Sequence, residues 1–164
     1  MIRNRAKIKA CIKNAYIFRD LVQKHGSIQN YFEMFSPHTS FENMMRLKDE
    51  IENHFYRLGK ITVFHFLTDI GLPVLKPDRV ICRIFERLGL IESRKNILET
   101  IIQGRKFAEA TGLPIRYIDI VFVAYGQVRS SEFGIERGIC LEEKPSCILC
   151  NAKSFCNYYS QQSV

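Results

Sequence analysis

The sequence predicts an all-α protein: a helical domain followed by a short cysteine-rich loop. Apolar residues recur at intervals of three and four through most of the chain, as they do in amphipathic helices. Glycine, proline and helix-capping residues separate these stretches, and no segment shows the alternation of a strand. The last part of the chain instead holds four cysteines within the seventeen residues from Cys140 to Cys156. We therefore expect a helical domain over residues 1–129 and a separate cysteine loop over residues 130–164.

The helices can be placed one after another from their apolar spacing and their caps. The first spans about 8–22 and stops at Gly26, and Ser27 is placed to cap a short second helix. The segment "SPHTS" reads as a loop, and Asp78, directly after Pro77, is placed to cap the helix that follows it. In that helix Arg79, Arg83, Glu86 and Arg87 are predicted to form the polar face. The remaining helices are expected at about 41–57, from Gly59 to near Gly71, at 94–111 and at 114–127.

Composition and charge limit the classes of function. The 164 residues amount to about one domain, 46% of them hydrophobic, and no apolar run approaches the roughly 20 residues that span a bilayer. The basic N-terminus lacks the apolar core of a signal peptide, so we expect a soluble cytoplasmic protein, associated with the nucleoid, or a nuclear one. The net charge is +7, and residues 1–19 hold six basic groups and no acidic one. Such a surface favours a nucleic acid partner, although a solvated helix face explains it equally well.

The cysteines favour a metal site over disulfides. Thiols clustered in a non-secreted chain more often bind metal, whereas Cys11 and Cys82 lie among apolar residues and are expected in the core. The other four follow the spacing C-x6-C-x2-C-x5-C. Zinc sites usually join two closely spaced pairs, and here only one C-x2-C pair is present. An iron–sulfur cluster is larger than one zinc ion and takes four thiolates. The spacing therefore favours an iron–sulfur cluster, with zinc and disulfides as alternatives.

The terminal segment "EKPSCILC" resembles the iron–sulfur loop of the endonuclease III and MutY group of DNA glycosylases, which has the same four-cysteine spacing. The resemblance implies a [4Fe-4S] cluster in this loop. It implies as ligands Cys140, Cys147, Cys150 and Cys156.

The central stretch is similar to the helix-hairpin-helix glycosylase superfamily. "LGKIT" takes the place of the DNA-binding hairpin, and "DRVICRIFERLGL" matches the run that begins at the catalytic aspartate. The resemblance implies Asp78 as the catalytic carboxylate. Arg57 stands where the family has its first hairpin glycine, and the register of the family's lysine nucleophile falls on Ile61. We therefore expect a monofunctional enzyme, with a bifunctional glycosylase/lyase that uses Lys60 as the alternative. The implied DNA-binding residues are Leu58, Gly59, Lys60 and Thr62.

The first helix, "IRNRAKIKACIKNA", is similar to a segment of the 3-methyladenine DNA glycosylase I group. The resemblances together imply a base-excision repair enzyme that hydrolyses the N-glycosidic bond of a damaged base in duplex DNA. The similarity of the first helix favours an alkylated base. In the family other helices precede this segment, and this sequence starts at it. The expectation is therefore a fragment, a domain that a second polypeptide completes, or a relative without catalysis. A non-catalytic iron–sulfur DNA-binding protein is the alternative from a different class.

Asp119 lies inside an otherwise apolar helical stretch. We expect its carboxylate to be buried, to pair with a nearby basic side chain such as Arg116, and to have a structural role.

Overall fold

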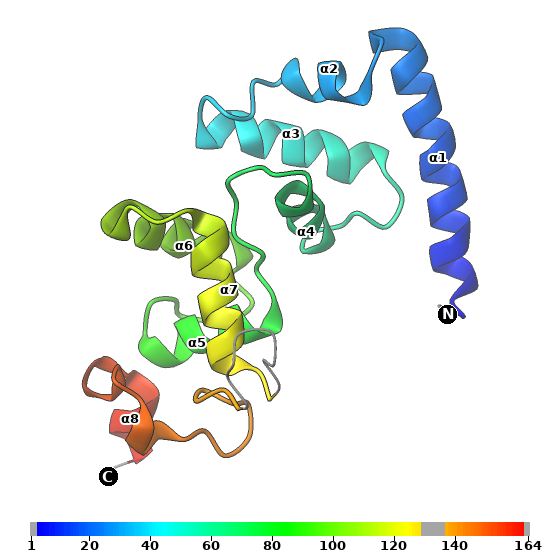
Figure 1. The fold of residues 1–164 in the computed structure, drawn as a ribbon. Helices are drawn as coiled ribbons and strands as arrows, with labels where there is room; N and C mark the ends of the chain where they lie inside the picture. Colours follow the sequence, from blue (N-terminus) through cyan, green and yellow to red (C-terminus); the bar gives the residue numbers. More distant parts are fainter. Residues whose placement is uncertain (1–2, 129–136, 163–164) are drawn as a thin grey trace. The chain divides into compact units, whose positions relative to one another are not determined.

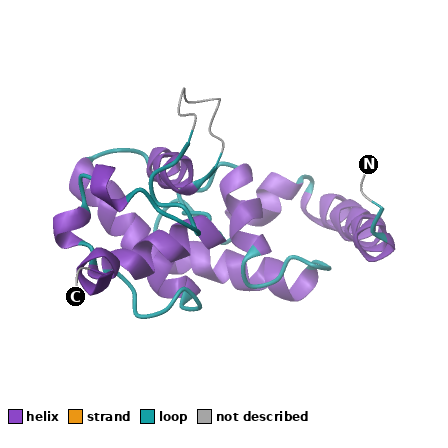
Figure 2. Cartoon of the chain, turned by 90° about the horizontal axis from the view of Figure 1, so that it is seen from below, coloured by secondary structure: helices purple, strands orange, loops and turns teal. Residues whose placement is uncertain are grey.

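A computed structural model describes residues 3–128 and 137–162 of the chain (Figure 1). The all-α prediction is confirmed, because these residues form helices and connecting loops without a strand (Figure 2). The chain divides into two compact units, Met1–Leu72 and Pro73–Val164. The boundary expected between residues 129 and 130 lies outside the described residues. None of the helices in the described ranges is long and apolar enough to cross a membrane.

In the described residues of the first unit, three of four helices begin at a side-chain N-cap. Asn4, Ser27 and Ser40 each accept a hydrogen bond from a backbone amide of the first turn that follows, as N-caps do. Gly26 ends the first helix with φ of 81°, a left-handed conformation that glycine adopts without strain. The helices are α1 (Arg5–His25), α2 (Ile28–Glu33), α3 (Phe41–His54) and α4 (Thr62–Asp69).

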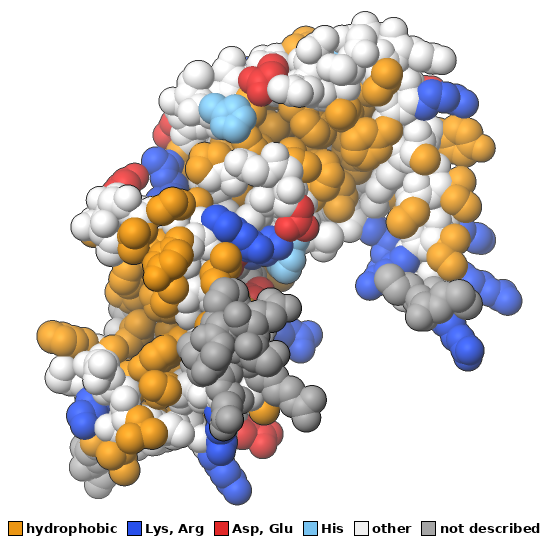
Figure 3. All heavy atoms as spheres, viewed as in Figure 1, with side chains coloured by type: hydrophobic (Ala, Val, Ile, Leu, Met, Phe, Trp, Pro, Cys, Tyr) orange, Lys and Arg blue, Asp and Glu red, His pale blue; other side chains and the backbone are white. Residues whose placement is uncertain are grey.

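The core of this unit lies between α3 and α4. Leu47, Ile51, Val63 and Leu67 are fully buried there. One face of α1 contacts the segment after α3, where the rings of Phe18 and Phe55 lie 4.9 Å apart. The other face of α1 is exposed and mixes apolar side chains with Lys and Arg (Figure 3). Its exposed apolar residues are Ile8, Ile12, Tyr16 and Val22.

The second unit packs three longer helices around an aromatic centre. The ring of Phe85 lies 5.7 Å from that of Phe107 and 4.9 Å from that of Phe122. Gly104 lets α6 approach the segment before α5, because a Cβ there would lie 2.6 Å from Leu75 Cδ2. The helices are α5 (Arg79–Leu88), α6 (Ile97–Thr111), α7 (Ile115–Gly126) and α8 (Asn157–Gln162), with short 3-10 turns η2 (Cys147–Leu149) and η3 (Lys153–Phe155).

The structure corrects three details. The helix expected over 41–57 ends at His54, because Phe55 is already extended. The next helices begin at Thr62 and Ile97, each about three residues later than expected. Cys11 is exposed on α1 and not in the core, since the apolar residues beside it lie on the solvent face, whereas Cys82 is buried as predicted.

Candidate active site and cysteine cavity

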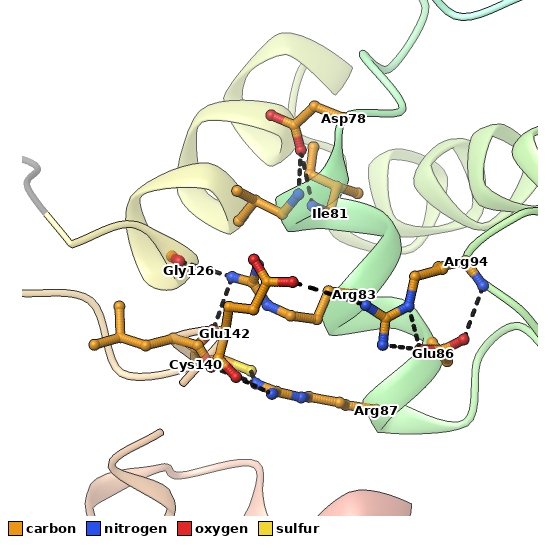
Figure 4. Close-up of polar contacts among 11 residues, drawn as sticks. Asp78, Ile81, Arg83, Glu86, Arg87, Arg94, Gly126, Cys140 and Glu142 are labelled. Carbon is orange, nitrogen blue, oxygen red and sulfur yellow. Dashed lines mark hydrogen bonds and ion pairs between the residues drawn. The ribbon is translucent and has the colours of Figure 1, made fainter. Parts of the chain in front are cut away.

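Asp78 forms the N-cap of α5. Its Oδ1 atom accepts hydrogen bonds from the backbone amides of Val80 and Ile81, both at 2.9 Å, which confirms the capping prediction. The preceding Pro77 is buried, and the side chain of Asp78 is itself half-buried. The second carboxylate oxygen points away from the two amides (Figure 4). The amides at the helix start thus hold one carboxylate oxygen in place and do not bind the other.

Asp119 of α7 lies close enough to Asp78 for their charges to interact. It is only 2% exposed and forms an ion pair with Arg116, so the predicted buried pair is confirmed. Burial raises the pKa of Asp119; the charge of Arg116 opposes this shift, and the negative charge of Asp78 adds to it. Within the described ranges, the Oδ1 atom of Asp119 has no hydrogen-bond partner. Asp119 is therefore a buried carboxylate near Asp78 that is shielded from solvent.

Near the other end of α5, Arg87 attaches the cysteine loop to the helix (Figure 4). Its Nη1 atom donates to the carbonyl of Leu141 at 2.6 Å and lies 3.4 Å from Cys140 Sγ. Its Nη2 atom donates to the carbonyl of Glu142 at 2.9 Å. The guanidinium also stacks over the ring of Tyr158, with 4.4 Å between its carbon and the ring centre. One side chain thus fixes three points of the loop.

Arg83 makes a second attachment one turn earlier. Its Nη2 atom donates to the carbonyl of Gly126 at 2.8 Å and to that of Cys140 at 3.1 Å, so it joins α5, α7 and the loop. Its pKa is lowered, first by burial and then by the positive charge of Arg87. Both arginines belong to the polar set of α5, yet both are buried: Arg83 is 3% exposed and Arg87 is 9% exposed.

The four loop cysteines line one cavity of about 230 Å³. The cavity lies between α5, α7 and the loop, and aliphatic, aromatic and basic side chains form the remainder of its wall. Its volume is several times the roughly 30 Å³ share of one water molecule. Among the described residues, no group of three or more His, Cys, Asp or Glu side chains is arranged so that it could hold a metal ion. The lining thiols are Cys140, Cys147, Cys150 and Cys156.

The four cysteines interact electrostatically, which changes the pKa of Cys147. Burial raises the pKa of Cys147, and the charges of Cys140, Cys156 and Cys150 raise it further, against the opposing charge of Arg87. Such mutual repulsion is relieved when thiolates share a cation. Tyr125 donates its hydroxyl proton toward Cys150 Sγ at 3.2 Å. Its own pKa is raised by burial, by this hydrogen bond and by the neighbouring thiol charges.

The predicted hairpin residues belong to the first unit: Leu58, Gly59 and Lys60 precede α4, and Thr62 is its first residue. Gly59 and Lys60 are exposed, and the carbonyl of Gly59 accepts from the amide of Val63 at 3.0 Å. No side chain of the described residues caps the N-terminus of α4. Arg57, which stands at the family's first glycine position, has φ of 62°. The backbone therefore keeps a conformation suited to glycine although the side chain is present.

Sequence reasoning missed Arg83, Arg87 and Tyr125 as parts of the cysteine site. The two arginines could have been suspected from their spacing of four on a strongly amphipathic helix, since this puts them on one side of it. Their burial depends on carbonyl groups of residues 126 and 140–142, which lie more than forty positions away in the chain. Such partners cannot be read from local pattern.

Comparison with known proteins finds a similarity at the front of the chain. Residues 1–61 match the family model of methyladenine glycosylase, which is little more than a third of the chain. The front of this chain is thus similar to a DNA glycosylase family, whereas Asp78 and the cysteine loop lie outside the matched residues. No curated protein and no solved structure matched the chain.

Proposed function

We propose that this protein is a helix-hairpin-helix DNA glycosylase that carries a [4Fe-4S] cluster and acts in base-excision repair. The observation that carries the proposal is the methyladenine glycosylase match of residues 1–61. A capping carboxylate on α5 and four thiols around one cavity add chemical support from the other unit. The reaction is hydrolysis of the N-glycosidic bond of a damaged base in duplex DNA. The match favours an alkylated purine as that base.

Asp78 supplies the catalytic carboxylate in this proposal. The target base first leaves the helical stack, as a base within duplex DNA cannot be reached otherwise. Breaking the N-glycosidic bond builds positive charge on the deoxyribose, and the free oxygen of Asp78 stabilises that charge or orients the attacking water. The amides of Val80 and Ile81 hold the other oxygen, so the carboxylate does not have to be ordered during the reaction.

The hairpin before α4 is proposed to bind the DNA backbone. Apart from its two chain neighbours, no described residue has an atom within 4 Å of the position that a Cβ on Gly59 would take, so a phosphate can approach the main chain there. The uncapped start of α4 offers backbone amides to an anion, and Lys60 adds a positive charge. The residues proposed to make these contacts are Leu58, Gly59, Lys60 and Thr62.

The donor set at the cysteine cavity supports the proposed cluster. Four thiols, the donor set of a [4Fe-4S] group, line a single space that is larger than one ion requires. When bound, the cluster supplies a rigid cross-link between four points of the loop. Arg83 and Arg87 hold that loop against α5, and no redox step on the DNA is required. The loop is not strongly basic, because Glu142 and Glu143 accompany Lys144, so DNA contacts are assigned to the hairpin and not to the loop.

A second polypeptide that completes the first unit is a further part of the proposal. Ile8, Ile12 and Tyr16 lie on one side of α1 and are 50%, 53% and 55% exposed. Large apolar side chains that are exposed side by side on a helix support a partner that covers them.

The test is a base-release assay on duplexes that each contain one alkylated, oxidised or deaminated base. Asp78→Asn is the informative variant because asparagine still caps a helix while the carboxylate charge is lost. We expect base release to fall by a factor of roughly 100 or more, with DNA binding nearly unchanged. Asp20→Asn, on the exposed surface of α1, is the matched control and should keep full activity.

Three outcomes would change the assignment. Unchanged turnover in Asp78→Asn would remove this residue from the mechanism. A borohydride-trapped DNA adduct that disappears in Lys60→Ala would make the enzyme a bifunctional lyase. Duplex binding without release of any base would identify a non-catalytic DNA-binding protein.

A further inference from the structure

Tyr125 contacts two of the four loop cysteines at once. Its backbone carbonyl, in the last turn of α7, accepts a hydrogen bond from the amide of Cys140 at 2.9 Å. Its hydroxyl lies 3.2 Å from Cys150 Sγ. The side chain is half-buried and lines the same cavity as the four thiols.

The direction of the hydroxyl contact follows from simple chemistry. A cysteine that ligates iron does so as a thiolate and has no proton to donate. A phenol, with an ordinary pKa of about 10, keeps its proton at neutral pH. In the loaded protein the hydrogen bond therefore runs from the Tyr125 O–H group to the Cys150 sulfur.

We propose that Tyr125 is a positioning residue for the iron–sulfur cluster, which orients the Cys150 thiolate and raises the reduction potential through its O–H···S hydrogen bond. This inference rests on the proposed cluster. Reduction adds negative charge, part of which resides on the ligand sulfurs. A hydrogen-bond donor at one of those sulfurs stabilises the reduced state more than the oxidised state.

The test compares Tyr125→Phe with the wild-type full chain, both purified without oxygen. Phenylalanine keeps the ring in the wall and leaves the backbone bond to Cys140 in place, so only the O–H group is lost. Tyr117→Phe is the matched control, since Tyr117 lies on the same helix, is 52% exposed and does not line the cavity. The readouts are the midpoint potential from a redox titration and the Fe–S(Cys) stretching frequencies in resonance Raman spectra.

We expect Tyr125→Phe to show a lower midpoint potential and shifted Fe–S(Cys) bands, with the Tyr117→Phe values equal to wild type. Equal potentials and equal bands in Tyr125→Phe and wild type would overturn the inference while leaving the cluster itself established. Wild-type protein without iron would instead refute the proposed cofactor.

Discussion

Replacement of Arg87 by methionine removes the main polar attachment between α5 and the cysteine loop. Methionine has a similar length and fills the space with apolar atoms, so the change isolates the guanidinium. It deletes the bonds to the carbonyls of Leu141 and Glu142 and the contact with Cys140 Sγ. It also deletes the stacking on Tyr158.

The magnitude follows from what remains unpaired. Leu141 is 4% exposed, so its carbonyl loses a charged partner without gaining water, and a bond of this kind contributes about 1.5–3 kcal/mol. The bond to Glu142, at an exposed residue, is partly replaced by solvent. The methionine variant no longer buries the guanidinium charge, and the desolvation cost that this removes offsets part of the loss. We therefore expect the free energy of unfolding to fall by about 3 kcal/mol.

The assay is denaturant unfolding of the reduced, metal-free chain, followed by circular dichroism. Arg79→Met is the matched control, because Arg79 is an exposed arginine of the same helix, and we expect it to change the free energy by less than about 0.5 kcal/mol. A loss below about 1 kcal/mol for Arg87→Met would refute the view that this side chain anchors the loop.

Three further changes test separate parts of the fold. Arg57→Gly should raise the free energy of unfolding by about 0.5–1 kcal/mol, because glycine relieves the left-handed backbone; a destabilised variant would contradict this. Gly104→Ala should lower it by about 1–3 kcal/mol in the same assay, since the new Cβ meets Leu75; an unchanged midpoint would show that the helices can separate. Asp119→Asn should stabilise the protein at neutral pH, because burial raises the folded-state pKa of Asp119, and its charged form therefore disfavours folding. That advantage should grow as pH rises through the interval between the unfolded and the raised folded pKa, and disappear below it; equal stability across the pH series would be the contrary result.

The elements governed by short-range interactions could be predicted from the sequence. The cap formed by Asp78 involves amides two and three residues away, and the stop at Gly26 depends on one backbone angle. The order of the helices follows from their apolar spacing, with ends that shift by about three residues. The pairing of Asp119 with Arg116 likewise joins neighbours on one helix.

The arrangement around the cysteines required the structure. Arg83 and Arg87 have the pattern of surface residues, and only the carbonyls of the distant loop make their burial favourable. In the sequence Tyr125 is one aromatic residue of an apolar helix, and only the folded structure shows that its hydroxyl contacts Cys150. The apolar neighbours of Cys11 predict a core position, yet Ile8 and Ile12 are exposed on α1 and so is Cys11.

Metal and sulfide analysis of protein purified without oxygen tests the central claim most directly. The account predicts a brown protein with about four iron atoms and four acid-labile sulfides per chain, both lost when Cys147 and Cys150 are replaced by serine. Colourless protein with one zinc ion per chain, or with oxidised cysteines and no metal, would contradict it.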